Sequence, residues 1–257
     1  MTEVEPRRLP PEFRQQPLTA RLLDDFSLCP RKFLLSFFVT EQDERRLRGG
    51  PAMLHQAVRQ ALLAIYQLGG PAERPLDELR ACFEQHWDGR RCADALEEQQ
   101  LHRAGHEMLE RYHAAHVSDA RRLVAHDLRL TGTAGGQELV AVADLVLQGQ
   151  DANLDVIRFV TARRPLSEAE LAHDLSAQVL WLLAQEHFRD RSPRVWYHAL
   201  RQGRYREVVL DQAQATHLRE DLAARVGRIH REEEFAPRRG PYCRWCRSRA
   251  GCPLWQR

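Results

Sequence analysis

Four cysteines at two distant places in the chain constrain this sequence more than any other feature. Three of them form the pattern C-x2-C-x5-C in the C-terminal tail, at Cys243, Cys246 and Cys252. Thiolates at this spacing can converge on one metal, and a tetrahedral thiolate site takes a fourth ligand. Cys29 is the natural candidate, because Cys82 and Cys92 fall in segments of helical pattern, where free thiols are the ordinary expectation. Soft thiolates suit zinc and iron–sulfur clusters alike, so the spacing leaves the metal open.

The rest of the chain has the character of an ordinary globular protein. Its 257 residues suit one compact domain, and no apolar run approaches the ~20 residues of a membrane span. Residues 1–17 contain four prolines and no apolar stretch of the kind a signal peptide needs, which predicts a flexible leader and a cytoplasmic protein. Net charge is only +2, but the segment 235–257 contains six arginines and no acidic residue.

Hydrophobic periodicity predicts an α/β fold. Helical patterns cover residues 18–38, 52–68, 76–117 (as two helices), 167–188 and 212–233. Strand-like runs cover residues 124–130, 138–147, 154–161, 195–200 and 206–210. The expected organisation is a single domain over 18–257, with a helical insertion over 40–117 and a cysteine-containing tail over 235–257.

The segment from Thr19 to Phe33, with Phe26 and Cys29-Pro30, and the tail cysteine spacing together resemble one known group of proteins. They are similar to the iron–sulfur members of the PD-(D/E)XK nuclease superfamily, which include RecB-like nuclease domains of the AddB type and the CRISPR adaptation exonucleases. The resemblance runs from about residue 18 to residue 253. It implies a restriction-endonuclease-like central mixed sheet flanked by helices. It also implies a 4Fe-4S cluster, with zinc as the alternative, held by Cys29, Cys243, Cys246 and Cys252.

The same resemblance implies positions for a nuclease site. In the family, strand carboxylates hold magnesium or manganese and a lysine assists the attack of water. His55, after Gly50, matches the family histidine, and Asp144 matches the aspartate at the end of its strand, although Ala141 replaces the preferred glycine. Gln178 matches the start of the family's Q-x-x-x-Y helix motif, but Leu182 replaces its tyrosine.

The third strand breaks the catalytic pattern. Arg158 occupies the position of the second acidic residue and Val160 the position of the lysine; the only lysine of the chain is Lys32. Asp155 is no simple substitute, because side chains alternate along a strand and Asp155 lies on the face opposite to Arg158. The site is therefore predicted to be degenerate. Arg158 is expected either to pair with Asp144 or to contact a phosphate.

Arginines of the tail are the expected nucleic-acid contacts. The candidate set, together with the strand arginine, is Arg158, Arg238, Arg239, Arg244, Arg247 and Arg249. Trp245 lies between two cysteines of the tail and either stacks on bases or shields the metal from water.

The main hypothesis is a catalytically degenerate iron–sulfur nuclease-like protein that binds DNA, with a helicase or another recombination or repair subunit as partner. One alternative is an active magnesium- or manganese-dependent nuclease with a rearranged site that uses His55, Asp144 and Asp155, with an arginine in the role of the lysine. The other is a redox-responsive protein–protein scaffold.

Overall fold

The computed structural model describes residues 9–38, 49–149, 153–246, 248–249 and 251–255. Contacts within the chain divide it into two compact units. Unit 1 combines residues 1–47, 131–141 and 211–257, and unit 2 combines residues 48–130 and 142–210. Unit 1 is therefore built from both ends of the chain.

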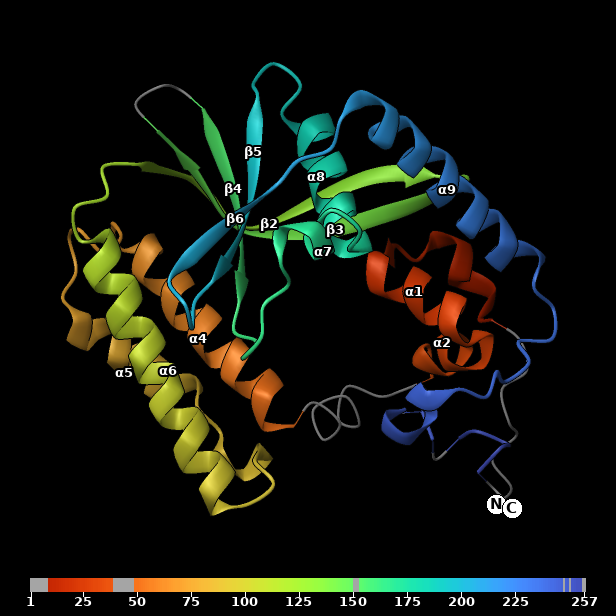
Figure 1. The fold of residues 1–257 in the computed structure, drawn as a ribbon, viewed down its shortest axis with the longest axis horizontal. Coiled ribbons are helices and arrows are strands. Elements are labelled where there is room, and N and C mark those ends of the chain that lie inside the picture. Colours follow the sequence, from red (N-terminus) through yellow and green to blue (C-terminus); the bar gives the residue numbers. More distant parts are fainter. Residues whose placement is uncertain (1–8, 39–48, 150–152, 247, 250, 256–257) are drawn as a thin grey trace. The chain divides into compact units, whose positions relative to one another are not determined.

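Unit 1 contains short helical elements and one long helix (Figure 1). Its elements are η1 (Pro11–Gln15), β1 (Leu18–Thr19), α1 (Ala20–Leu28), α2 (Pro30–Ser36), α9 (Gln212–Arg231) and η3 (Pro241–Trp245). The hydroxyl of Thr19 accepts a hydrogen bond from the Leu22 amide and caps α1. The single helix predicted over 18–38 is broken at Cys29, which is extended, because Pro30 starts a new helix at its N1 position.

An aromatic cluster fills the core of unit 1. Phe33 is fully buried and contacts Phe13, Phe26, Phe37 and Phe235, with ring centroids 5.0 to 6.3 Å from its own. Phe13 belongs to the segment expected to be a flexible leader, of which residues 1–8 lie outside the described part. Phe13 is buried and anchors η1 in unit 1, while Glu12, Arg14 and Gln15 beside it are exposed.

The helices of unit 2 are α4 (Gly50–Gln67), α5 (Leu76–His86), α6 (Ala95–His116), α7 (Glu168–Leu171) and α8 (Leu175–His187), with a short η2 (Gly89–Arg91). Helices α4, α5 and α6 pack side by side (Figure 1). The long helix predicted over 167–188 is two helices. Ser167 and Glu170 form a capping box on α7, and Asp174 accepts a hydrogen bond from the Ala177 amide as a new N-cap for α8.

The sheet is mixed, which confirms the predicted fold class. Its longer strands are β2 (Arg122–Ala134), β3 (Gln137–Gln148), β4 (Leu154–Val160), β5 (Pro193–Ala199) and β6 (Arg204–Val208). In unit 1, β1 runs parallel to the start of β3. In unit 2, β3 pairs antiparallel with β4, β4 parallel with β5, and β5 antiparallel with β6, while β2 also pairs with β3.

Alternation along the strands of unit 2 assigns side chains to two faces. Ile157 and Phe159 of β4 join the apolar core formed with α4, α5 and α6. Arg158 lies between them in sequence and points to the opposite face, and α8 packs against β5. Within the described ranges, no helix is both long enough and apolar enough to cross a membrane.

Candidate functional site

The aspartate predicted from the family pattern lies deep in unit 2. Asp144 of β3 has a fully buried side chain whose two oxygens are both engaged. Oδ1 accepts hydrogen bonds from Arg59 Nε at 2.5 Å and Arg158 Nη1 at 3.1 Å, and Oδ2 accepts one from the Phe159 amide at 2.6 Å. The structure thus contains the pairing of Arg158 with Asp144, which is the first of the two roles expected for that arginine.

Arg59 is a member of this site that the sequence motifs do not indicate. It lies on α4 one turn after His55, on the same face of the helix, and its side chain is only 14% exposed. Besides Asp144 it pairs with Asp127 of β2, a non-glycine residue in the left-handed region with φ of 48°. The spacing of four residues from His55 is the one signal in the sequence that could have indicated Arg59.

His55 lies near Asp144 but does not bind it. Its Nδ1 is 3.3 Å from the hydroxyl of Thr161, just after β4. Burial lowers the pKa of His55; the charge of Asp144 opposes this effect, while Arg158 and Arg59 lower the pKa further. Since the pKa lies below its usual value of about 6.5, the imidazole is neutral at pH 7.

Asp155 points away from Asp144, as strand alternation predicts. It is 4% exposed, and its carboxylate accepts hydrogen bonds from Arg121 at 2.8 Å, Arg194 at 3.0 Å and the Trp196 indole at 2.9 Å. These three donors satisfy it as a structural ion pair on the other face of the sheet.

The two remaining motif positions also have local roles. The side-chain amide of Gln178 on α8 donates to the carbonyl oxygen of Ala172 at 2.7 Å, so it works within the α7–α8 connection. Val160, at the position of the family lysine, supplies no charge, and its carbonyl accepts a hydrogen bond from the Leu200 amide at 2.9 Å.

Magnesium or manganese does not fit this arrangement. Such ions take several oxygen ligands, commonly from more than one carboxylate. Asp144 is held by two guanidinium groups, and the described residues contain no group of three acidic, histidine or cysteine ligand atoms that includes it within 4.8 Å. Two arginines beside one carboxylate would also repel a divalent cation.

The four cysteines, by contrast, line one pocket of unit 1. Its walls contain Cys29, Arg31, Lys32, Leu35, Pro237, Arg238, Tyr242, Cys243, Cys246, Ser248, Cys252, Leu254 and Trp255. The amide of Arg238 donates to the Cys29 sulfur at 3.3 Å, and the amide of Gly240 donates to the Cys243 sulfur at 3.3 Å. Amide donors of this kind stabilise a thiolate, so the donor set and its surroundings fit a thiolate-bound metal group.

Spacing of the sulfurs bears on the kind of group. In a zinc tetrahedron with Zn–S bonds of about 2.3 Å, neighbouring sulfurs lie about 3.8 Å apart. Among the described residues, no three of the cysteine sulfurs lie within 4.8 Å of one another. The four sulfurs thus share a pocket, and their arrangement fits thiolate coordination without selecting zinc or a cluster.

Hydrogen bonds hold the tail against the α1–α2 junction within unit 1. The Arg238 guanidinium donates to the Ser27 carbonyl at 2.6 Å, and the Tyr242 hydroxyl donates to the Leu28 carbonyl at 2.7 Å. Arg239 and Arg244 are exposed, and Arg247 lies outside the described residues.

Two arginine–tryptophan pairs lie on the surface of the tail. The Arg244 guanidinium lies 4.7 Å from the ring centroid of Trp245, and that of exposed Arg249 lies 3.6 Å from the centroid of Trp255. Trp245 is 71% exposed, so its ring faces solvent rather than a buried group.

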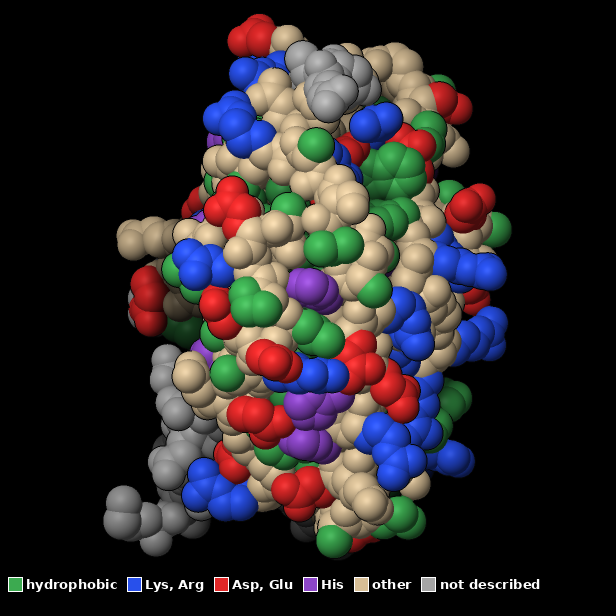
Figure 2. Space-filling view, turned by 90° about the vertical axis from the view of Figure 1, so that its left-hand side faces the viewer, with side chains coloured by type: hydrophobic (Ala, Val, Ile, Leu, Met, Phe, Trp, Pro, Cys, Tyr) green, Lys and Arg blue, Asp and Glu red, His purple; other side chains and the backbone are tan. Residues whose placement is uncertain are grey.

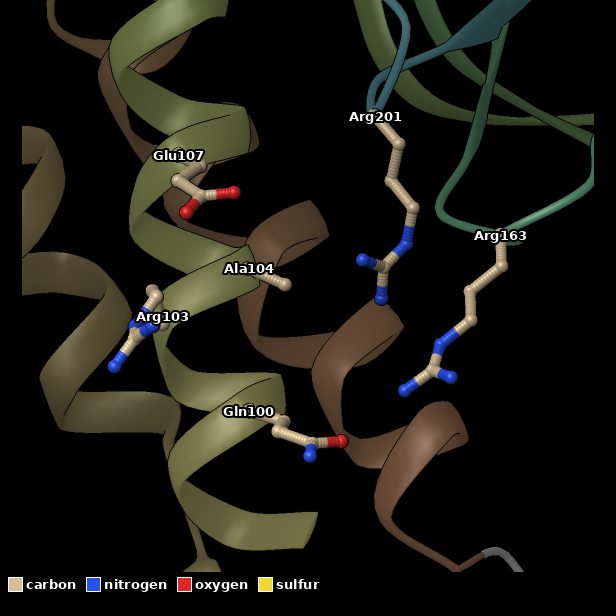
Figure 3. A pocket seen from close by; sticks show the side chains of 6 residues that line it. All are labelled: Gln100, Arg103, Ala104, Glu107, Arg163 and Arg201. Carbon is tan, nitrogen blue, oxygen red and sulfur yellow. The ribbon is translucent and has the colours of Figure 1, made fainter. Parts of the chain in front are cut away.

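A second basic feature lies in unit 2, in an open pocket beside α6 (Figure 3). Its lining residues are Gln100, Arg103, Ala104, Glu107, Arg163 and Arg201. Arg163 follows β4 and Arg201 lies in the β5–β6 turn, and both side chains extend toward α6 in Figure 3. Burial lowers the pKa of Arg201, the nearby charge of Arg163 lowers it further, and Glu107 partly opposes both effects.

A mixed sheet with helices on both faces and a buried aspartate in β3 defines an α/β fold. The sequence model of the PD-(D/E)XK nuclease superfamily matches residues 17–253, and the chain belongs to this superfamily. A search among curated proteins gave no match. Fourteen chains of solved structures match. One, described as "Crystal structure of SSO0001", is 16% identical over 63% of this chain and 77% of that chain, with a TM-score of 0.31. A TM-score of this size adds nothing to the fold assignment.

Proposed function

We propose that this protein is a catalytically degenerate PD-(D/E)XK nuclease-like protein that binds DNA without cutting it, as a subunit or recruiter in recombination or repair. The observation that carries the proposal is the saturation of Asp144 by Arg59, Arg158 and the Phe159 amide. A carboxylate held by two arginines is a poor ligand for a divalent cation. The metal ion that activates water in the family would therefore not be bound here.

Other residues of the site support the same conclusion. Asp155 is engaged by three donors on the opposite face of the sheet, which removes the second carboxylate that a rearranged site would need. Val160 supplies no charge at the lysine position, and Lys32 pairs with Asp25 in unit 1. Arg158 is not free to take the role of the lysine, because it already pairs with Asp144.

We further propose that Cys29, Cys243, Cys246 and Cys252 hold a 4Fe-4S cluster. The shared pocket and the amide donors to two of the sulfurs support a thiolate-bound metal group, and the resemblance of the cysteine pattern to the iron–sulfur members of the superfamily favours a cluster over a single zinc ion. Such a cluster would supply covalent cross-linking of the two chain ends and the capacity to transfer one electron. The protein contributes four thiolates and their amide partners.

DNA is expected to contact the basic surface of the tail. Arg244 on Trp245 and Arg249 on Trp255 pair a cation with an exposed ring, a combination that contacts phosphates and stacks on bases. The open pocket of unit 2 adds Arg163 and Arg201, whose mutual repulsion a phosphate would relieve. A partner subunit, such as a helicase, would then supply the enzymatic activity.

The test is a cleavage assay on single- and double-stranded DNA with magnesium and with manganese, on protein purified without oxygen, with Asp144→Asn alongside. We expect no cleavage by either protein, and DNA binding by both. Cleavage by the wild type that disappears in Asp144→Asn would overturn the proposal in favour of an active nuclease.

The DNA-binding part has its own test. Each phosphate neutralised adds about 0.9 to the slope of log affinity against log salt for duplex DNA. The double variant Arg239→Ala, Arg244→Ala should lower that slope by about two. The matched control is Arg90→Ala, a single change to a side chain that is 91% exposed on η2, outside the tail; it should leave the slope unchanged. A flat salt dependence in the wild type would refute DNA binding and favour the protein–protein scaffold.

A further inference from the structure

A histidine–glutamate cluster lies on the surface of α5 and α6 in unit 2, and it shares no residue with the Asp144 site or with the four-cysteine pocket. Glu84 in the last turn of α5 faces His102 and His106, which are one turn apart on α6. The Nε2 atom of His102 lies 2.9 Å from Glu84 Oε1, and that of His106 lies 2.7 Å from the same oxygen. Among the described residues, this is the single group of three ligand atoms that all lie within 4.8 Å of one another.

The packing beneath the cluster fixes the two imidazoles. Phe83 is fully buried next to Glu84, and its ring contacts those of His102 and His106 at centroid distances of 5.6 and 5.1 Å. The ring of Trp87 contacts the ring of His102 at a centroid distance of 5.1 Å. Gly105 makes this packing possible, since a Cβ at that position would lie 2.4 Å from the Phe83 ring. A glycine inside a helix lowers the stability of that helix by about 1 kcal/mol relative to alanine. The Phe83 ring fills the space that a side chain at position 105 would occupy.

The cluster is also accessible from solvent. The side chains of Glu84, His102 and His106 are 48%, 37% and 25% exposed. Figure 2 shows this face of the molecule, with histidine side chains grouped among acidic ones. An open groove lined by Trp87, Ala95, Glu98, Gln99, His102 and Arg103 borders it. A small ion can therefore enter, and water can complete its coordination.

We propose that Glu84, His102 and His106 form a binding site for a divalent transition metal ion of the zinc class. Two imidazole nitrogens and one carboxylate oxygen are a ligand set that zinc, cobalt and nickel favour, with the remaining positions open to water. Magnesium and calcium are disfavoured because they prefer oxygen ligands. Histidines four residues apart on a helix present both nitrogens on one side, and Glu84 closes the third side from the neighbouring helix.

Both imidazole Nε2 atoms face the same carboxylate oxygen, so the three ligand atoms already converge on one point between the helices. A bound metal ion would take the place of the protons in these hydrogen bonds, because a ligating imidazole nitrogen must be deprotonated.

The site is independent of the proposed DNA and cluster functions, and its test separates it from the cysteines. Cobalt(II) is titrated into the full-length protein purified with its tail site intact, and bound metal is measured by equilibrium dialysis. The variants are His102→Gln and His106→Gln, and the matched control is His86→Gln, an exposed histidine on α5 outside the cluster. Subtracting the spectrum of the His106→Gln sample removes the colour of the tail site and any cobalt bound to thiolates.

We expect one equivalent of cobalt bound by the wild type and by His86→Gln, with visible bands of a nitrogen- and oxygen-ligated ion and without thiolate charge transfer. Each cluster variant should weaken this binding by more than about tenfold, because even loss of a partner of a metal ligand has an effect of that size. Thermal midpoints measured in chelator should be equal in all four proteins, which excludes unfolding as the cause. Equal cobalt binding in all four proteins, binding with only a thiolate spectrum, or no binding to the wild type would overturn the proposal.

Discussion

Arg59 reaches Asp144 from α4, and Arg158 reaches it from the neighbouring strand β4. The two guanidinium groups occupy the place beside the carboxylate that a metal cation would otherwise take. The sequence indicates Arg158, because strand alternation places it on the same face as the motif aspartate. It does not indicate Arg59 in the same way, since which side chain of a helix reaches a strand is decided by the packing of α4 in unit 2. The position of Arg59 one turn after His55 indicates a role in the site only once its ion pair with Asp144 is seen in the structure.

Truncation of the Asp144 side chain should be strongly destabilising. Asp144→Ala leaves Arg59, which is 14% exposed, and the Phe159 amide without their buried partner. We expect a loss of about 3–5 kcal/mol in the free energy of unfolding, measured by urea denaturation. Asp127→Asn is the matched control: its side chain is 55% exposed and asparagine tolerates positive φ, so the loss should stay below about 1 kcal/mol. Similar losses in both variants would show that Asp144 is not the centre of the network.

His198 provides a pH dependence of stability. Burial lowers its pKa to about 3, and the charges of His116 and Arg121 add to this effect. Because the folded pKa lies below the unfolded value of about 6.5, the contribution of the neutral ring is complete above pH 6.5. It is lost as the pH falls from 6.5 toward 3, by up to about 1.4 kcal/mol per pH unit.

The measurement is the free energy of unfolding in urea between pH 7.5 and pH 5 for the wild type and for His198→Phe. Phenylalanine preserves the stacking on Tyr205, whose ring lies 3.9 Å away, and removes a buried Nδ1 that has no hydrogen-bond partner. The stability of the variant should fall less steeply below pH 6.5, whereas the exposed control His86→Gln should follow the wild type. Parallel curves for all three proteins would contradict the assignment.

At the scale of elements, the pattern of the sequence located the helices and strands and missed the breaks between them. The strands predicted from alternation at 138–147 and 154–161 correspond to β3 and β4. The two long helices predicted over 18–38 and 167–188 are each divided, at Cys29 and at Asp174. Both breaks have local causes, a proline at N1 and an aspartate cap, which apolar periodicity does not register.

Close packing of α5 on α6 depends on one glycine. Gly105→Ala places a Cβ 2.4 Å from the ring of buried Phe83, so the gain in helix propensity is outweighed by overpacking. We expect a net loss of about 1–3 kcal/mol in unfolding free energy. Gly227→Ala on α9 is the matched control, because its nearest neighbour is the flexible end of Arg231 at 3.3 Å; it should be neutral or stabilising by up to about 1 kcal/mol. Urea denaturation of both variants checks the difference, and a stabilised Gly105→Ala would show that Phe83 is free to move.

At the scale of the whole molecule, the cysteine pattern anticipated which distant segments share a unit. A site that takes Cys29 from near the start and Cys243, Cys246 and Cys252 from the tail requires both ends in one place, and unit 1 is built from both ends. The division into two units was not predicted. Residues 131–141 of the β2–β3 hairpin belong to unit 1 while its remainder belongs to unit 2, and no composition change marks that boundary.

Loss of one tail thiolate should therefore destabilise unit 1 as well as remove its metal. In Cys243→Ser we expect iron and acid-labile sulfide to be lost from protein purified without oxygen. Binding of a structural metal can contribute about 10–16 kcal/mol, so losing even a third of this should lower the thermal midpoint by about 10 °C. Cys82→Ser, at a half-buried thiol of α5 in unit 2, is the matched control and should retain the wild-type iron content and midpoint.

Stoichiometric zinc in the wild type would select the other metal while keeping the cross-link between the chain ends. A Cys243→Ser protein with full iron content and an unchanged midpoint would show that the tail cysteines do not hold a metal group, and that the aromatic cluster around Phe33 holds the two ends together without it.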